Sequence, residues 1–331
     1  MRIQEIFKVS ALASAIVLGG CGGDIKIQPT VNDNSVTTDN SVTTTTNAPE
    51  ETVNPCATRG SLQGKFDGTD CEYNASFASK NVEITEDITF SALANEGAHY
   101  FAGALLIGED CNTTTSCTIT NGPTLTVEEG ATLAFSSGES IIRIARGAKI
   151  NAVGTFENPI PCTSTNAIER LDVVGSGAQF ADWGGIIING NGITNQCTDA
   201  QRAAETCNVA TEGVTSYFGG SNNADNSGTI QYAKIWYAGS GPKVGGEGDD
   251  LNSLTLNGVG SGSSFDYLHI HQGFDDGIEF FGGASTISHI VVTDTQDDAI
   301  DIDAGWQGKG QYIFVKHGTV KTKKDVVVDG V

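Results

Sequence analysis

Two near copies of one acidic phrase, DDGIEF and DDAIDI, begin at Asp275 and Asp297. Each copy contains two adjacent carboxylates and a third carboxylate three residues further on, and a slide of 22 residues superposes the two copies. Closely spaced carboxylates serve as catalytic acid and base groups, as cation ligands, or as solvated turn residues. The three alternatives predict different functions, so the elements that position these residues must be considered next.

The same slide of 22 residues aligns apolar positions. Ile290 falls over Leu268, and the alternating apolar residues on either side align in the same way. A slide of 24 residues extends the pattern back to LNSLTLNGVG at 251–260. Short alternating strands, broken by Gly and Asp at a fixed period, are typical of a solenoid in which each coil stacks on the previous one. We therefore predict an all-β fold, a parallel β-helix of about 22 residues per coil, right-handed because parallel crossovers almost always are.

The N-terminus has the features of a bacterial lipoprotein precursor. An apolar run at 9–18, VSALASAIVL, follows Arg2 and Lys8 and is too short to span a bilayer. It leads into LGGC, which resembles the lipoprotein box and implies cleavage before Cys21 and lipidation of that residue.

The chain is thereby divided into three parts. Residues 1–20 form the predicted signal peptide, residues 21–54 a disordered stalk rich in Thr, Asn and Ser, and residues 55–331 the β-helix domain. Gly22, after the lipidated cysteine, favours the outer membrane by the sorting tendency of such lipoproteins. The last residues, DVVVDGV, form an apolar strand without a polar cap, so we expect either an incomplete chain or a last coil covered by a partner.

The charge balance restricts the partners. Removal of the signal peptide changes the formal net charge from −22 to −23, and no arginine follows Arg202. So acidic a chain does not bind nucleic acid by counterion release, and bare anionic membrane surfaces repel it. The expected partners are the membrane, through the lipid, and a polysaccharide or another envelope component.

The remaining cysteines indicate an oxidising compartment. Their short, polar spacings favour three disulfides with one thiol left unpaired, and spacing alone also allows other pairings. The predicted pairs are Cys56–Cys71, Cys111–Cys117 and Cys197–Cys207, with Cys162 unpaired.

The stacked carboxylates carry an electrostatic cost. Adjacent coils lie about 4.8 Å apart, where two unit charges repel by about 3 to 4 kcal/mol at an effective dielectric near 20. Full solvation, raised pKa values or a bound cation relieves this repulsion, and oxygen ligands select calcium. The candidate calcium ligands are Asp275, Asp276, Glu279, Asp297, Asp298, Asp301 and Asp303.

The order of several motifs resembles that of a large family of secreted or surface-attached bacterial proteins with a pectate-lyase-like β-helix and no established activity. These motifs include VEEGATL, DWGGIIINGNG, DDGIEFFGG and DDAIDIDAG, and the resemblance covers most of 123–311. It implies the β-helix fold and an envelope location.

A second, local resemblance is to the polygalacturonases, whose motifs T-D-G-I-D and D-D-C-I-A-I carry the acid and base of an inverting glycoside hydrolysis. It implies catalytic roles for Asp276, Asp297 and Asp298. The G-H-G and R-I-K motifs of those enzymes are missing, since the chain has only KHG at His317 and no later arginine. We therefore expect a binding or structural module, with a hydrolase or lyase as the alternative.

Outward-facing side chains complete the candidate sites. Strand alternation places Trp236 and Phe281 on the outside of the coil and, with Trp306, makes them candidates for stacking on sugar rings. The same alternation turns His269 and His271 outward on one face. Two such histidines suit a transition metal, but no third ligand is evident at matching depth, and a polar strand surface is the simpler interpretation.

Overall fold

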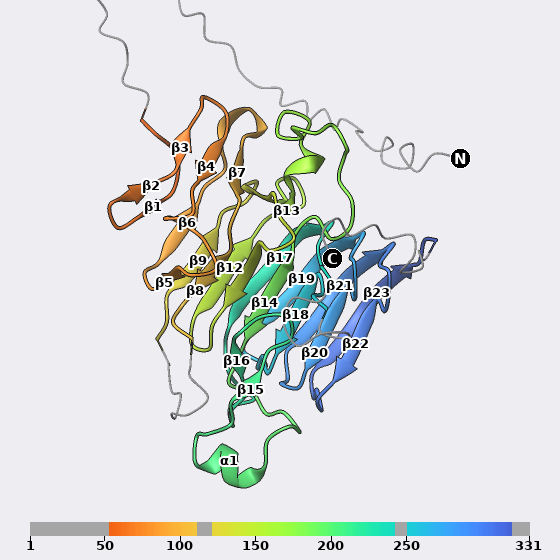
Figure 1. Ribbon diagram of the computed structural model, residues 1–331. Helices are drawn as coiled ribbons and strands as arrows, with labels where there is room; N and C mark the ends of the chain where they lie inside the picture. The colour runs from red at the N-terminus through yellow and green to blue at the C-terminus, as the bar shows by residue number, and fades with distance from the viewer. Residues whose placement is uncertain (1–52, 111–120, 242–249, 320–331) are drawn as a thin grey trace, which may run out of the picture. The chain divides into compact units, whose positions relative to one another are not determined.

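The computed structural model describes residues 53–110, 121–241 and 250–319, and these form a solenoid of two large sheets (Figure 1). All strands in the two sheets pair in parallel except β3, which is antiparallel to β4. The 12-stranded sheet contains β3 (Lys65–Phe66), β4 (Cys71–Tyr73), β6 (Ile88–Phe90), β7 (Ala98–Phe101), β9 (Thr124–Val127), β10 (Thr132–Phe135), β12 (Lys149–Val153), β13 (Ile160–Ser164), β17 (Gly228–Trp236), β19 (Ser264–His271), β21 (Thr286–Thr293) and β23 (Lys309–Lys316). The 7-stranded sheet contains β5 (Glu83–Ile84), β8 (Leu105–Ile107), β11 (Ile141–Ile144), β14 (Gly185–Asn189), β18 (Leu254–Asn257), β20 (Ile278–Phe281) and β22 (Ile300–Asp303).

Small elements decorate the solenoid. Two antiparallel pairs are β1 (Thr58–Arg59) with β2 (Leu62–Gln63), and β15 (Val209–Ala210) with β16 (Tyr217–Phe218). The helical elements are α1 (Asp199–Ala203) and two 3-10 turns, η2 (Ala94–Glu96) and η3 (Thr165–Ala167). Within the described ranges no helix has the length and apolarity that a membrane crossing requires.

The predicted stacking register is confirmed in the C-terminal coils. Leu268 pairs with Ile290, and Ile278 pairs with Ile300, each 22 residues further along the chain. The period fails upstream: Ile186, on β14, pairs with Ile142 on one side and with Leu254 on the other, at much longer separations. Loops inserted between the strands lengthen these coils, so 22 residues per coil is wrong for the N-terminal part.

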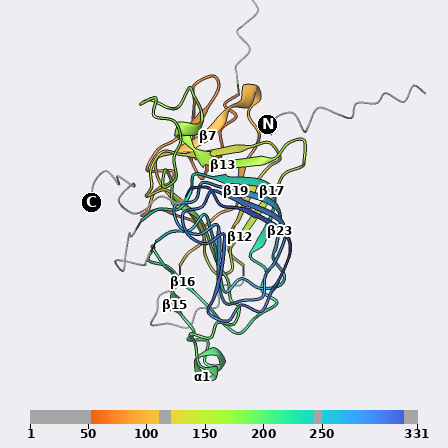
Figure 2. The ribbon, with the colours of Figure 1, turned by 90° about the vertical axis from the view of Figure 1, so that its right-hand side faces the viewer.

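The long strands of the 12-stranded sheet bend at one residue each. The pairing skips these residues, which adopt the left-handed conformation and divide each strand into two segments on different faces. The residues at the bends are Tyr232 (φ 50°), Tyr267 (φ 52°), His289 (φ 49°) and Tyr312 (φ 57°). Because of the bend, Phe265 and Leu268 both point into the core, although strict alternation would separate them. The coils superimpose in the view of Figure 2.

The core is a continuous apolar column inside the coils. In the N-terminal part it contains a stack of four aromatic rings, all at most 2% exposed. Ring centroids are 4.7 Å apart for Tyr73 and Phe101, 5.4 Å for Phe101 and Phe135, and 4.6 Å for Phe135 and Trp183.

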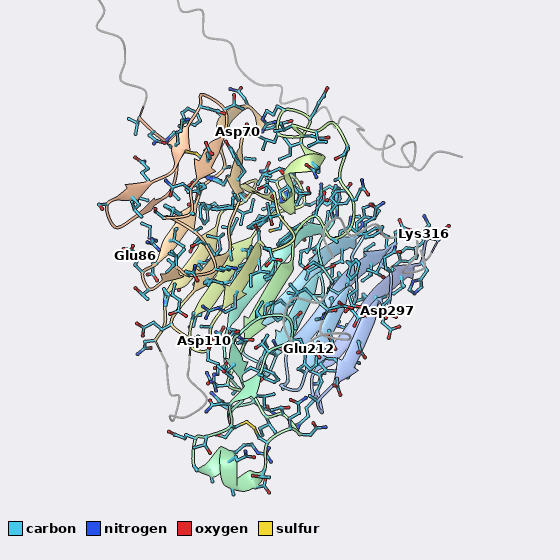
Figure 3. All side chains as sticks on the ribbon, viewed as in Figure 1. Asp70, Glu86, Asp110, Glu212, Asp297 and Lys316 are labelled. Carbon is cyan, nitrogen blue, oxygen red and sulfur yellow. A yellow bond between two sulfur atoms is a disulfide. The ribbon has the colours of Figure 1, made fainter. Side chains whose placement is uncertain are left out.

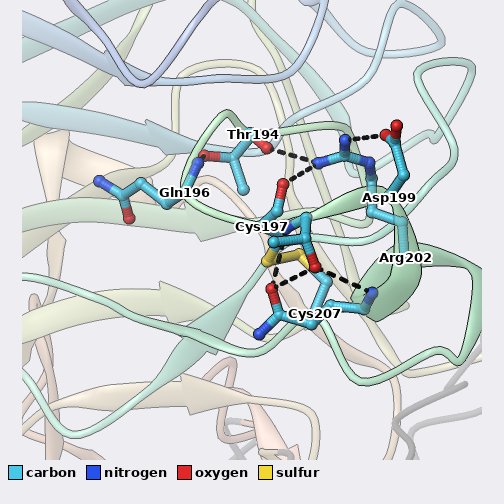
Figure 4. A network of polar contacts seen from close by, with 8 residues as sticks. Thr194, Gln196, Cys197, Asp199, Arg202 and Cys207 are labelled. Carbon is cyan, nitrogen blue, oxygen red and sulfur yellow. Dashed lines mark hydrogen bonds and ion pairs between the residues drawn. A yellow bond between two sulfur atoms is a disulfide. The ribbon is translucent and has the colours of Figure 1, made fainter.

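An insertion between β14 and β17 projects from the solenoid and carries α1. The Arg202 guanidinium donates to the carbonyl oxygens of Thr194 (3.0 Å) and Cys197 and pairs with Asp199 (Figure 4). At its base, buried Arg146 donates to the carbonyls of Cys207 (3.1 Å) and Gly219 (3.0 Å). The disulfide therefore stabilises the insertion internally, and the buried Arg146 attaches it to the coils.

The cysteine predictions are confirmed where the structure describes them. Cys56–Cys71 and Cys197–Cys207 are disulfides, and Cys162 is a buried free thiol. Burial raises the pKa of the Cys162 thiol to about 12. The predicted Cys111–Cys117 pair, the signal peptide, the lipidated Cys21, nearly all of the stalk and the DVVVDGV end lie outside the described residues.

Candidate functional site

The two acidic phrases meet on the outer surface of the 7-stranded sheet. Glu279 on β20 pairs with Asp301 on β22, and the turns that precede these strands carry the adjacent aspartates. Two groups of carboxylates each have oxygen atoms within 4.8 Å of one another: Asp275, Asp276 and Asp297, and Asp276, Glu279 and Asp301. Asp276 belongs to both groups, so five carboxylates form one continuous acidic cluster.

The two central carboxylates are buried. Asp276 is 7% exposed and Glu279 is 8% exposed, which excludes well-solvated turn chemistry for these two residues. The backbone N–H of Asp298 donates to Asp276 Oδ1 at 2.9 Å, and Asn252 Nδ2 donates to Glu279 Oε2 at 2.5 Å. Asn252 also accepts from the Asp276 N–H through Oδ1, at 3.1 Å, and so connects both acids.

Burial and mutual repulsion make both groups hard to ionise. Loss of solvation is the largest cause that raises the pKa of Asp276 to about 8, and the Asp275 charge adds to it. Burial likewise raises the pKa of Glu279 to about 9, followed by repulsion from Glu212 and Asp276. Without a cation, the cluster holds protons at neutral pH.

The structure narrows the predicted ligand set. Asp275, Asp276, Glu279, Asp297 and Asp301 come together, whereas Asp298 and Asp303 are exposed and belong to neither group. The Asp303 carboxylate instead accepts from the Ala304 N–H at 2.6 Å. A single site built from all seven predicted residues is therefore wrong.

Two contributors were missed in the sequence. Glu212, labelled in Figure 3, comes from the inserted segment, and its charge acts on Glu279 only because of the fold, so no spacing in the sequence indicates it. The slide of 24 residues that extends the repeat to 251–260 also superposes Asn252 on Asp276, and this alignment is the signal in the sequence for its role.

Phe281 is buried and the half-buried Trp306 packs partly against the core, so the three predicted residues do not form one aromatic platform. Phe281 is 4% exposed because Phe218 of the insertion covers it. Trp306 packs its indole against Phe280, with ring centroids 4.4 Å apart, and donates to the Ser285 carbonyl at 3.2 Å. Trp236 is half-buried and is the one that keeps an outward position.

A cleft of about 550 Å³ lies on the same sheet in earlier coils. Its lining includes Lys80, Glu83 and the buried Arg143, which donates to Glu83 Oε1 at 3.2 Å. The segment 213–216 also lines the cleft and directly follows Glu212, whose charge acts on Glu279. One inserted segment therefore borders both the cleft and the acidic cluster.

Parallel coils, a continuous internal core and outward polar clusters define a parallel β-helix protein. The model of the pectate-lyase-like β-helix domain matches residues 104–329. This match spans more than half of the chain, so the protein belongs to that family, and this membership supports a carbohydrate-related role. Neither the curated proteins nor the solved structures contain a match to the chain.

Proposed function

We propose that the protein is a lipid-anchored envelope module that binds extracellular polysaccharide, with calcium held by the acidic cluster. The observation that carries this proposal is the burial of Asp276 and Glu279 within a group of five carboxylates. Buried carboxylates at this spacing need either protons or a cation. Calcium suits them because it takes six to eight oxygen ligands in flexible geometry.

The exposed side of the cluster gives such a cation access to a ligand. Asp297 is exposed and Asp275 and Asp301 are partly exposed, whereas Asp276 and Glu279 form the buried floor. A cation seated on this floor keeps coordination positions toward solvent for water or sugar oxygens. Family membership supports carbohydrate as the ligand class.

Thermal unfolding with and without calcium tests the metal. Calcium should raise the melting temperature of the parent protein, and saturation at 100 times Kd corresponds to about 2.7 kcal/mol. The double variant Asp276→Asn, Glu279→Gln should show no calcium response, while the exposed-site control Asp298→Asn, Asp303→Asn should respond like the parent. Absence of a calcium shift in the parent would contradict the proposed site.

The pH dependence gives an independent check. The pKa values of Asp276 and Glu279 are about 8 and about 9 in the folded protein, against about 4 in an unfolded chain. The folded state then binds more protons, so cation-free protein should lose stability as pH rises from about 4 through about 9. Calcium should remove most of this loss, and the Asn/Gln double variant should not show it.

Two further measurements test binding and location. Affinity electrophoresis through neutral and acidic polysaccharides should retard the parent protein with calcium and not with a chelator. In cells, Cys21→Ser should release the protein from membranes or block its maturation. If the Cys21→Ser variant fractionates with membranes as the parent does, the lipid anchor is refuted, and the proposal of polysaccharide binding is unaffected.

A hydrolase or lyase is the second candidate, favoured by one observation. The raised pKa of Asp276 suits a general acid, and Asp297 lies beside it with an exposed carboxylate. Their oxygens lie within 4.8 Å, closer than the roughly 6.5–9.5 Å of inverting enzymes. This separation argues against the inverting mechanism. New reducing ends or unsaturated products from a polysaccharide panel, abolished by Asp276→Asn, would establish catalysis.

A further inference from the structure

The outer face of β19 carries a second cluster of metal-ligating side chains, on the 12-stranded sheet. His269 Nε2 lies 3.2 Å and His271 Nδ1 lies 2.8 Å from the same atom, Thr293 Oγ1 of the next coil. Asp294 Oδ2 lies 3.6 Å from His271 Nδ1. The two imidazole nitrogens therefore share one hydroxyl, with the Asp294 carboxylate beside His271, and Asp294 is the candidate third ligand that the sequence did not reveal.

Aromatic rings flank the two histidines, and the region remains partly open to solvent. The Trp236 ring centroid lies 5.4 Å from that of His269 and 5.9 Å from that of His271, and Tyr237 lies 5.8 Å from His271. The side chains of His271 and Asp294 are 24% and 29% exposed. A small cation can therefore reach His271 and Asp294 from solvent.

We propose that His269, His271 and Asp294 form a binding site for a zinc-class divalent cation. A tetrahedral ion with bonds of about 2.0–2.1 Å places its ligand atoms about 3.3 Å apart, close to the 3.6 Å between His271 Nδ1 and Asp294 Oδ2. Three protein ligands leave one coordination position for water or an external ligand.

The protonation state of the two imidazoles suits cation binding. Burial lowers the pKa of His269 to about 4, and the charges of His271 and Lys234 contribute. Burial also lowers the pKa of His271. Both rings are thus neutral at pH 7, and no proton has to leave before a metal binds.

Two features moderate the affinity. The ligand atoms of this site are further apart than those of the two acidic groups, which lie within 4.8 Å of one another. The His269 ring must therefore turn from Thr293 toward the ion. Lys234 and Lys316, the latter labelled in Figure 3, place positive charge near the histidines. Neutralising Lys316 should therefore tighten cation binding.

The ligand chemistry separates this site from the proposed calcium site. Imidazole nitrogen favours zinc, cobalt and copper, whereas clustered carboxylates favour calcium. The two sites also lie on different sheets, so each can be removed without the other.

Metal titration of the intact protein tests the proposal, with Zn²⁺ followed by Trp fluorescence and Co²⁺ by visible absorption. The parent should bind one Co²⁺ with the intense bands of tetrahedral coordination, and zinc should displace it. His269→Gln, His271→Gln and Asp294→Asn should each weaken zinc binding at least tenfold, and Lys316→Gln should strengthen it several-fold.

Two controls keep the outcome unambiguous. His289→Gln removes a histidine from another part of the same sheet, and Asp276→Asn, Glu279→Gln removes the acidic cluster; both should bind zinc like the parent. Loss of zinc binding only in the acidic variant, or unchanged affinity in His271→Gln and Asp294→Asn, would overturn the proposal.

Discussion

Two aromatic stacks run along the solenoid, one inside the N-terminal coils and one outside the C-terminal coils. The interior stack joins Tyr73, Phe101 and Phe135, at inward strand positions, with Trp183 from the bend before β14. The exterior stack consists of Tyr232, Tyr267, His289 and Tyr312, with centroid distances of 4.4, 4.3 and 4.7 Å. Coil stacking aligns rings in both places, but burial stabilises the first stack, whereas the second occupies strained turns.

The backbone makes the difference clear. Every member of the exterior stack has φ between 49° and 57°, a conformation that costs a residue with a Cβ about 1–2 kcal/mol. Ring pairs at these distances return about 0.5–1.5 kcal/mol each. The three ring pairs therefore offset only about half of the strain of the four residues, and the exterior stack adds no net stability.

The largest effect is expected in the interior stack. Phe135→Ala should lower the free energy of unfolding by about 3–5 kcal/mol, because it leaves a cavity between Phe101 and Trp183. Phe135→Leu fills part of that space and should therefore lower the free energy of unfolding by clearly less. Denaturant unfolding measures both variants. A loss below 1 kcal/mol for Phe135→Ala would show that the interior stack contributes little to stability.

The same contrast explains what the sequence could predict. The C-terminal coils have few insertions, so the 22-residue spacing of Leu268 and Ile290 was visible and their register is confirmed. The bends were not predictable, because nothing in the residue type of Tyr267 indicates a positive φ. The N-terminal coils vary in length, and a fixed period cannot detect them.

The candidate site follows the same rule. The stacking of Glu279 and Asp301 was predicted from the repeat and is confirmed. The long insertion places Glu212 where its charge acts on Glu279 and also covers Phe281, and neither effect follows from local spacing. Side chains positioned by the repeat were therefore predictable, and those positioned by the insertion were not.

A second, smaller effect concerns His99, the buried histidine beside the interior stack. Buried His99 bonds to the Tyr73 hydroxyl at 2.8 Å, and burial lowers its pKa. The unfolded chain takes up this proton near pH 6.5 while the folded chain does not, so His99 should cost stability as pH falls below that value. The slope is at most about 1.4 kcal/mol per pH unit for one proton.

Unfolding measured between pH 7 and pH 5 in His99→Gln should lack this component. His289→Gln, the matched variant in the exterior stack, should keep the component that comes from His99. If the parent and His99→Gln depend on pH in the same way, the buried histidine is not responsible for the acid sensitivity.

The smallest effect tests the strain in the exterior stack. At an extended strand position glycine is less stable than alanine, but at φ 52° alanine keeps the steric penalty and glycine escapes it. Both Tyr267→Ala and Tyr267→Gly lose the ring contacts with Tyr232 and His289. We therefore expect Tyr267→Gly to be more stable than Tyr267→Ala by about 1 kcal/mol. The control is Val291, an outward position of β21 paired in regular register, where Val291→Ala should be more stable than Val291→Gly. An alanine variant at 267 that is as stable as the glycine variant would mean that the turn is relaxed, and the exterior stack would then add stability as the interior one does.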